Sequence, residues 1–222
     1  MLSALYYLFL IALCTLFMLL SAVALVICWP FDKGRRVVHE LSRILVRTFF
    51  FVPLRWRQKV VGLEYVDRKK QYVIVLNHNT VIDIPALYYV PLNFRWVSKR
   101  EVFKTPFFGQ YLVLHGDICI DRGRAAEAME QLLRKGKRWI SRGASIAIFP
   151  EGTRSKDGEI HRSKPVLLRW LRRPASRFCQ WCWTGRNRLS GGTCSSTGGI
   201  ALRCGFCRPF RSSGSFPPTC TN

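Results

Sequence analysis

The fold of this chain is decided by the stretch YVIVLNHNTVIDIPALYYV at residues 72–90. Its first five residues are apolar and largely β-branched, which predicts a buried strand over residues 72–76. Pro85 suits the first turn of a helix, which we expect over residues 86–90. His78 and Asp83 then fall in a strand-to-helix connection, where α/β proteins commonly carry reactive groups.

The same alternation continues on both sides of this stretch. Short apolar runs predict strands over residues 59–64, 94–97, 118–120 and 145–149, and an amphipathic pattern predicts a helix over residues 125–141. Strands that alternate with helices indicate an α/β domain.

The N-terminal segment has a different character. Residues 1–31 contain no charged side chain, and the apolar run over residues 4–28 exceeds the roughly 20 residues that cross a bilayer as a helix. A cleaved signal peptide would need a basic start, a shorter apolar run and a small-residue cleavage site, so we expect a membrane anchor. Lys33, Arg35 and Arg36 follow the run and nothing basic precedes it, which places the rest of the chain in the cytoplasm.

The net charge of +22 is typical of proteins that bind nucleic acid or an anionic membrane surface. The anchor favours the membrane, because residues 32–59 combine basic side chains with an aromatic run at residues 49–51. We therefore expect an interfacial segment on anionic lipids and no nucleic-acid partner. An ordinary amphipathic helix packed on its own domain is the alternative.

Two segments carry candidate chemistry. His78 precedes Asp83 by five residues, so the carboxylate can orient the ring and stabilise its charge while the other ring nitrogen takes a proton from a hydroxyl. The segment FPEGTRS at residues 149–155 offers backbone amides, a hydroxyl and a fixed cation, which together suit a phosphate.

With these segments in place, residues 60–162 closely resemble the glycerolipid acyltransferase family, in particular its bacterial 1-acyl-sn-glycerol-3-phosphate acyltransferases. Three blocks carry the resemblance, at residues 77–85, 116–122 and 149–155. It implies that His78 is the general base with Asp83 as its partner, and that Arg122 binds the phosphate of the acceptor. It further implies that the acceptor site is lined by Glu151, Gly152, Thr153 and Arg154.

Two further positions follow from the resemblance. Lys99 is similar to a lysine that the family places before a Pro-x-x-Gly turn, here at residues 106–109, and the resemblance implies that it binds substrate. Cys119 stands where the family usually has an apolar residue, and we expect a buried strand thiol there.

The reaction implied by the resemblance is direct acyl transfer. The acyl group passes from acyl-carrier protein or coenzyme A to the sn-2 hydroxyl of 1-acyl-sn-glycerol-3-phosphate (lysophosphatidic acid), giving phosphatidic acid without a cofactor, a metal or a covalent enzyme intermediate. The expected place is the inner, cytoplasmic membrane, with the catalytic domain facing the cytoplasm. Another lyso-lipid acceptor is the alternative within the same family.

The last segment, residues 163–222, contains no Asp or Glu and holds most of the nine cysteines of the chain. The Gly-Val-Pro-Val strand block that the family carries after its third block is missing there. Reading across codon boundaries restores part of it, since Trp181-Cys182 can only give Val and Cys182-Trp183 can only give Leu. We hypothesise that the reading frame slips near residues 162–163 and that the tail is out-of-frame translation. Two Cys-x-x-Cys pairs, at 179–182 and 204–207, leave a zinc-ribbon-like binding protein as an alternative of another class.

The sequence thus predicts a membrane anchor (1–31), a basic interfacial segment (32–59), the N-terminal part of an acyltransferase domain (60–162) and a frame-shifted tail (163–222). The fold class is α/β, an incomplete mixed sheet with flanking helices, with no native fold after residue 162. A domain that lacks part of its sheet is expected to be unstable and impaired in activity.

Overall fold

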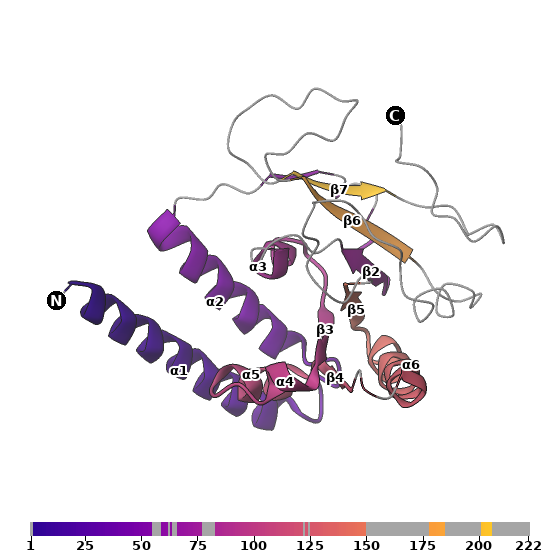
Figure 1. Ribbon diagram of the computed structural model, residues 1–222, viewed down its shortest axis with the longest axis horizontal. Helices are drawn as coiled ribbons and strands as arrows, with labels where there is room; N and C mark the ends of the chain where they lie inside the picture. The colour runs from indigo at the N-terminus through magenta and orange to yellow at the C-terminus, as the bar shows by residue number, and fades with distance from the viewer. Residues whose placement is uncertain are drawn as a thin grey trace.

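The structure, a computed structural model, describes residues 2–54, 59–61, 63, 66–76, 83–121, 123, 125–149, 178–184 and 201–205. The last two ranges are described by their backbone alone. These residues form one mixed seven-stranded sheet with helices on both faces (Figure 1). The strand order is β1-β7-β6-β2-β5-β3-β4. The α/β class and the mixed sheet predicted from the sequence are therefore confirmed.

Four neighbouring strands that precede the tail segment 163–222 are parallel. They are β2 (Val73–Leu76), β5 (Ser145–Ile148), β3 (Phe94–Lys99) and β4 (Ile118–Ile120). Their register pairs Val73 with Ile146 and Val97 with Ile118. At the opposite edge, β1 (Lys59–Val61) pairs in parallel with the C-terminal strand β7.

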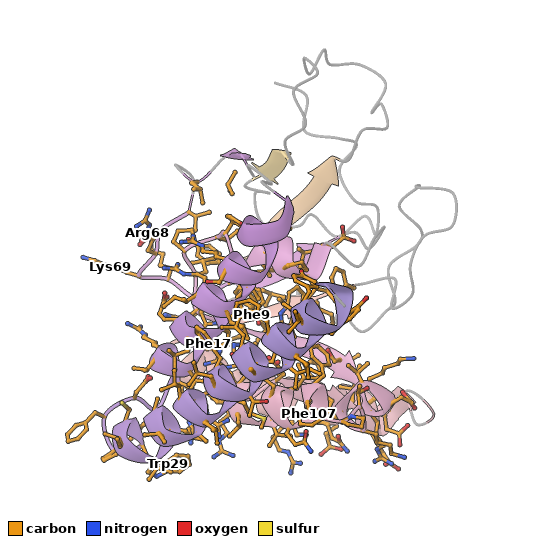
Figure 2. All side chains as sticks on the ribbon, turned by 90° about the vertical axis from the view of Figure 1, so that its left-hand side faces the viewer. Phe9, Phe17, Trp29, Arg68, Lys69 and Phe107 are labelled. Carbon is orange, nitrogen blue, oxygen red and sulfur yellow. The ribbon has the colours of Figure 1, made fainter. Side chains whose placement is uncertain are left out.

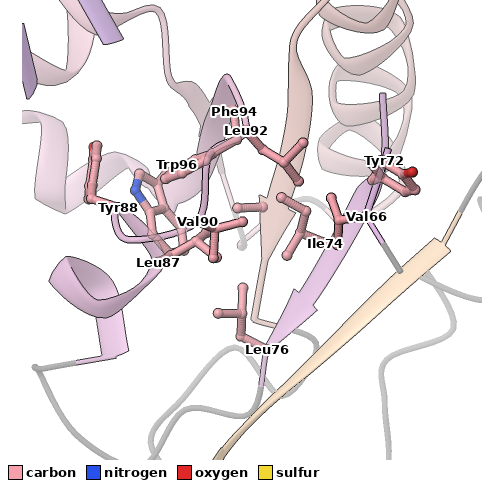
Figure 3. Close-up of a cluster of buried hydrophobic side chains, with 11 residues drawn as sticks. Val66, Tyr72, Ile74, Leu76, Leu87, Tyr88, Val90, Leu92, Phe94 and Trp96 are labelled. Carbon is pink, nitrogen blue, oxygen red and sulfur yellow. The ribbon is translucent and has the colours of Figure 1, made fainter. Parts of the chain in front are cut away.

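The two faces of the parallel strands carry separate hydrophobic clusters, because successive side chains of a strand point to opposite faces. On β2, Ile74 and Leu76 join a cluster with Phe94 and Trp96 of β3 (Figure 3). Val73 and Val75 join the other cluster, which packs against Trp139 of helix α6 (Ala125–Ser141). Burial on both faces explains why β2 is a continuous apolar run in the sequence.

The N-terminal helix α1 (Leu2–Cys28) leads through residues 29–35 into α2 (Arg36–Leu54), and the two pack together on the same side of the sheet (Figure 1). Its segment Leu5–Cys28 is long and apolar enough to cross a membrane, judged by length and composition. Many of its side chains are exposed, among them Phe9 at 54% (Figure 2). An exposed apolar helix near the N-terminus is compatible with the predicted membrane anchor.

Helix α2 lies inside the segment predicted to be interfacial. Val38, His39 and Ser42 are buried, so this part of the helix packs on the domain itself, as the alternative interpretation held. Asp32, which precedes the helix, stabilises its start, because its Oδ2 accepts a hydrogen bond from the amide of Val37 at 2.8 Å. The side chains of the aromatic run 49–51 lie outside the described part of the structure.

Helix α3 (Asp83–Leu87) starts earlier than the predicted helix at residues 86–90. Its first residue is Asp83, and an acidic side chain is favourable in the first turn of a helix. Residues 88–90 continue as a tighter turn, with amide-to-carbonyl bonds from Tyr88 to Pro85 and from Val90 to Leu87. The chain therefore turns sooner after β2 than the position of Pro85 indicates.

Two strands come from the tail, for which the sequence predicts no native fold. β6 (Phe178–Thr184) pairs in parallel with β2, and β7 (Ala201–Gly205) pairs antiparallel with β6. At these two segments the prediction is corrected. Residues 178–184 are rich in aromatic residues, a composition that strands favour, and backbone pairing does not require particular side chains. The frame-slip hypothesis and the segment limits at residues 31, 59 and 162 stay predictions.

Candidate active site

The parallel strands bring the three sequence blocks to one edge of the sheet. β2 ends at Leu76, immediately before the block at 77–85, and β5 ends at Ile148, immediately before the block at 149–155. β4 ends at Ile120, within the block at 116–122, and β3 ends at Lys99. Because these strands are parallel, their carboxyl ends share one edge, the usual place of ligand sites in such sheets.

Asp83 is positioned at this edge by the start of helix α3. The residue is buried, with only 1% of its surface exposed. A carboxylate held rigidly at a helix start can orient an imidazole and stabilise its positive charge. His78, the predicted base, lies outside the described residues, so the distance between the two stays a prediction.

Lys99 is exposed at the end of β3 and pairs in register with Ile120 of β4. It leads into α4 (Arg100–Phe103) and then into the predicted turn at 106–109. A Cβ on Gly109 would lie 2.0 Å from the carbonyl oxygen of Phe103, so the last residue of the turn must be glycine for α4 and α5 (Phe108–His115) to pack. This packing explains why a Pro-x-x-Gly turn follows the lysine.

The remaining predicted site residues lie outside the described part of the structure. They are Arg122, Glu151, Gly152, Thr153 and Arg154. Cys119 is half-buried, not buried, because β4 is the last strand of the sheet order and has a neighbour on one side. Its carbonyl oxygen lies 3.5 Å from Nζ of Lys135.

A buried polar network lies between α2, the end of α5 and the strands β3 and β4, and sequence reasoning missed it. His115, at the end of α5, has Nδ1 2.7 Å from Oδ1 of Asp117 and Nε2 3.0 Å from Nδ1 of His39. Asp117 also accepts a hydrogen bond from the amide of Trp96 at 2.7 Å. The network links α2 and the end of α5 to β3 and to the start of β4.

Arg95 completes the network and is fully buried. Its guanidinium donates to the carbonyl oxygens of Gly34 at 2.6 Å and Arg35 at 3.0 Å, and lies 4.9 Å from the ring centre of Trp139. Burial lowers its pKa to about 10, so the side chain keeps its charge at neutral pH. A lone arginine in a strand is usually taken as solvated, which is why the sequence did not single it out.

Burial also lowers the pKa of the two histidines. It lowers the pKa of His39 well below its usual range, with further contributions from His115, Arg95 and Arg43. It lowers the pKa of His115 too, and here Asp117 acts in the opposite direction. Both rings are therefore neutral at pH 7. The signal for His115 was its place directly before the block at 116–122, whereas no sequence pattern distinguishes His39.

Among the described residues, no group of three or more His, Cys, Asp or Glu side chains is placed to hold a metal ion. The cysteines of the two Cys-x-x-Cys pairs have side chains outside that description. The zinc alternative is thus a matter for experiment.

The described structure is an α/β fold in which a buried carboxylate begins a helix, and in which the strand ends precede or lie within the three sequence blocks. The sequence profile described as Acyltransferase matches residues 57–177, more than half of the chain. The chain belongs to this acyltransferase family. The match extends past residue 162, where the sequence analysis placed the end of the resemblance.

Individual relatives agree with the family. A 1-acyl-sn-glycerol-3-phosphate acyltransferase from Helicobacter pylori is 41% identical over 88 residues, covering 39% of this chain and 37% of that protein. The human 1-acyl-sn-glycerol-3-phosphate acyltransferase beta is 32% identical over 151 residues, covering 66% of this chain and 53% of that protein. The chain spans about half or less of the length of these relatives.

The fold is similar to that of a solved structure. The 1-acyl-sn-glycerophosphate (LPA) acyltransferase from Thermotoga maritima superimposes with a TM-score of 0.58 at 21% identity, covering 87% of this chain and 83% of that one. At this identity, the likeness supports the fold.

Proposed function

We propose that this protein transfers an acyl group to the sn-2 hydroxyl of 1-acyl-sn-glycerol-3-phosphate and so forms phosphatidic acid. The observation that carries the proposal is the shared edge of β2, β5, β3 and β4, which precedes or includes each of the three family blocks. The relatives named above support the acceptor, since both are 1-acyl-sn-glycerol-3-phosphate acyltransferases.

In this proposal, His78 removes the proton of the acceptor hydroxyl as that oxygen attacks the thioester of the donor. Asp83, buried at the start of α3, orients the imidazole and stabilises its positive charge. Arg122 binds the phosphate, Lys99 is a further substrate-binding residue, and the acceptor site is completed by the residues of the third block, Glu151, Gly152, Thr153 and Arg154. The donor is acyl-carrier protein or coenzyme A, and no cofactor takes part.

The proposed location is the inner, cytoplasmic membrane. Helix α1 supplies an apolar span, and Lys33, Arg35 and Arg36 directly after it favour a catalytic domain on the cytoplasmic side. Anionic lipids are the proposed surface partner, because the chain carries a net charge of +22.

The tail is proposed to arise from a slipped reading frame. Resequencing the DNA from the codon of Glu151 to the stop tests this origin. A missing or extra base near codon 162 supports the slip. An unchanged base count contradicts a sequencing error. In that case the two Cys-x-x-Cys pairs become candidates for a zinc assay.

Acyl transfer is tested with the full chain and with a frame-restored chain, by measuring phosphatidic acid formed from 1-acyl-sn-glycerol-3-phosphate and acyl-coenzyme A or acyl-carrier protein. The His78→Ala variant should lose activity by about 100-fold or more, the contribution typical of a general base. Lys69→Gln is the control, since Lys69 is exposed before β2. Transfer to another lyso-lipid at a higher rate would favour the alternative acceptor, and unchanged activity in His78→Ala would contradict the proposal.

A further inference from the structure

The loop between α1 and α2 meets the C-terminal end of α6 on the lower side of the molecule (Figure 1). Their backbones touch, because a Cβ on Gly34 would lie 2.5 Å from the carbonyl oxygen of Arg142. Nη2 of Arg36 lies 3.2 Å from the position that a Cβ on Gly143 would take. Two segments that are far apart in the sequence therefore form one surface.

This surface gathers arginine side chains. Cζ of Arg35 lies 5.4 Å and Cζ of Arg142 lies 5.7 Å from the ring centre of Trp139, which belongs to α6. Arg138 directly precedes this tryptophan and is exposed, as is Arg36. We call the four arginines, Arg35, Arg36, Arg138 and Arg142, the arginine patch.

Carboxylates do not neutralise the arginine patch within the described part of the chain. The ion pairs found there join other side chains, and none of them includes Arg36, Arg138 or Arg142. Asp32 lies in the same loop, but its Oδ2 accepts a hydrogen bond from the backbone of α2. Burial lowers the pKa of Arg35, and the charges of Arg142 and Arg138 lower it further. The arginines thus repel one another, and a bound anion would relieve that repulsion.

The helices themselves account for only one of these charges. Arg138 lies in the last turn of α6, where the helix dipole favours a cation. Arg36 is the first residue of α2, where the same dipole disfavours a cation. The position of Arg36 beside the end of α6 therefore points to a partner outside the described fold.

Exposed aromatic side chains next to the patch indicate the chemistry of this partner. Trp29 is 61% exposed and Phe31 is 91% exposed, and both follow directly on the apolar span Leu5–Cys28 (Figure 2). Tryptophan at the boundary of the hydrocarbon layer, with basic side chains at the level of the headgroups, is typical of a membrane interface. An acidic protein would also attract the arginines, but it does not explain an apolar span that ends beside them.

We propose that the arginine patch binds the phosphates of anionic phospholipids, so that the C-terminal end of α6 rests on the membrane surface together with the loop after α1. This inference rests on the proposed membrane location and goes beyond it. It assigns a lipid contact to a helix that the sequence places within the acyltransferase domain, outside the basic segment at residues 32–59.

Two double variants separate the patch from the net charge of the chain. Arg36→Gln with Arg138→Gln removes two exposed charges from the patch, one from each segment. The matched control, Arg68→Gln with Lys69→Gln, removes two exposed charges from the loop before β2, which lies away from Trp29 (Figure 2). Both double variants lower the net charge equally, so a difference between them reports the position of the charges.

Native mass spectrometry of the full chain, released from neutral detergent micelles, measures the dissociation constants of two lipids. Dioleoyl-phosphatidylglycerol is anionic, and dioleoyl-phosphatidylcholine has the same acyl chains and no net charge. We expect the unsubstituted chain to prefer the anionic lipid and the patch variant to lose about tenfold or more of that preference, because each cation near an anionic surface contributes about fivefold. The control should keep the preference. Trp29→Ala should weaken both lipids alike, because an indole ring contacts the part that the lipids share.

Thermal unfolding in the same micelles excludes loss of the fold as the cause of weaker binding. The inference is overturned if the patch variant keeps the preference, or if the control loses it equally. Weaker binding of acyl-carrier protein with an unchanged lipid preference would identify an acidic protein as the partner and would also overturn it. An unsubstituted chain that binds both lipids equally overturns the inference alone. If that chain binds neither lipid, the proposed membrane location fails as well.

Discussion

His115 presents its two ring nitrogens to partners of opposite kind, with Nδ1 2.7 Å from Oδ1 of Asp117 and Nε2 3.2 Å from Nη1 of Arg95. A carboxylate only accepts and a guanidinium only donates, so Nδ1 carries the proton and Nε2 is the acceptor. Nδ1 of His39, 3.0 Å from the same Nε2, must then be a donor as well. These hydrogen bonds require a neutral His115, because a protonated ring has no acceptor nitrogen for Arg95 and His39.

Acidification should therefore destabilise the fold. Burial lowers the pKa of His39 and of His115 in the folded protein, whereas in the unfolded chain both titrate near 6.5. Below that value the unfolded chain binds more protons, so the stabilisation that is complete above about pH 6.5 is lost as the pH falls. Thermal unfolding recorded between pH 8 and pH 5 should show a falling midpoint.

The variant His39→Phe isolates one of the two groups. His39 lies against Tyr88 and Phe94, so a phenyl ring suits its surroundings while removing a titratable site. The variant should be less stable at pH 8 and should lose less stability on acidification. An unchanged pH dependence would show that His39 does not contribute to it.

Replacing Arg95 should be costly. Arg95→Leu removes one hydrogen-bond donor from the carbonyl oxygens of Gly34 and Arg35 and from Nε2 of His115. It also takes a buried cation away from the buried carboxylate of Asp117, so we expect a loss of about 3 kcal/mol or more in the free energy of unfolding. Urea unfolding measures this change in the free energy of unfolding. Arg142→Gln is the comparison, because Arg142 also lies over Trp139, at 5.7 Å, but is only half-buried. Equal effects of the two substitutions would contradict the importance of the network.

Gly116 should not tolerate a side chain. Its φ of 89° lies in the left-handed region, and a Cβ there would lie 2.5 Å from the ring of Trp139. Gly116→Ala should therefore cost about 1–3 kcal/mol of stability. At Gly123, in the turn after Asp121, a Cβ would meet its nearest neighbour at 3.4 Å, so Gly123→Ala should cost much less. A thermal shift assay of both variants compares them directly.

The tail offers a prediction on the sheet itself. Because β6 pairs with β2, removal of residues 163–222 exposes one edge of β2 and should lower the unfolding midpoint. Hydrogen exchange should then show faster exchange of the amides of β2. An unchanged midpoint and unchanged exchange would favour the tail as out-of-frame translation that adds nothing to the fold.

Local patterns were sufficient for much of the fold. The helix Ala125–Ser141 and the strand Ile118–Ile120 have the predicted bounds, because their apolar spacing and flanking turns are properties of consecutive residues. The start of α3 was predicted wrongly. Pro85 was taken to mark the first turn of the helix, whereas the helix begins at Asp83, whose acidic side chain also favours a helix start. For the site, the sequence indicated Asp83, and the structure places it buried at the expected edge.

By itself, the sequence determined the family, the apolar N-terminal helix and the strand-helix alternation, because each is written in spacing and composition along the chain. Tertiary structure alone decided the strand order β2-β5-β3-β4 and the buried network of His39, Arg95, His115 and Asp117. Those residues are far apart in the sequence, and their burial depends on partners that only the folded chain supplies. An arginine side chain stays in water unless acceptors from other elements replace its hydrogen bonds to water. A local sequence pattern does not show which distant elements supply those acceptors.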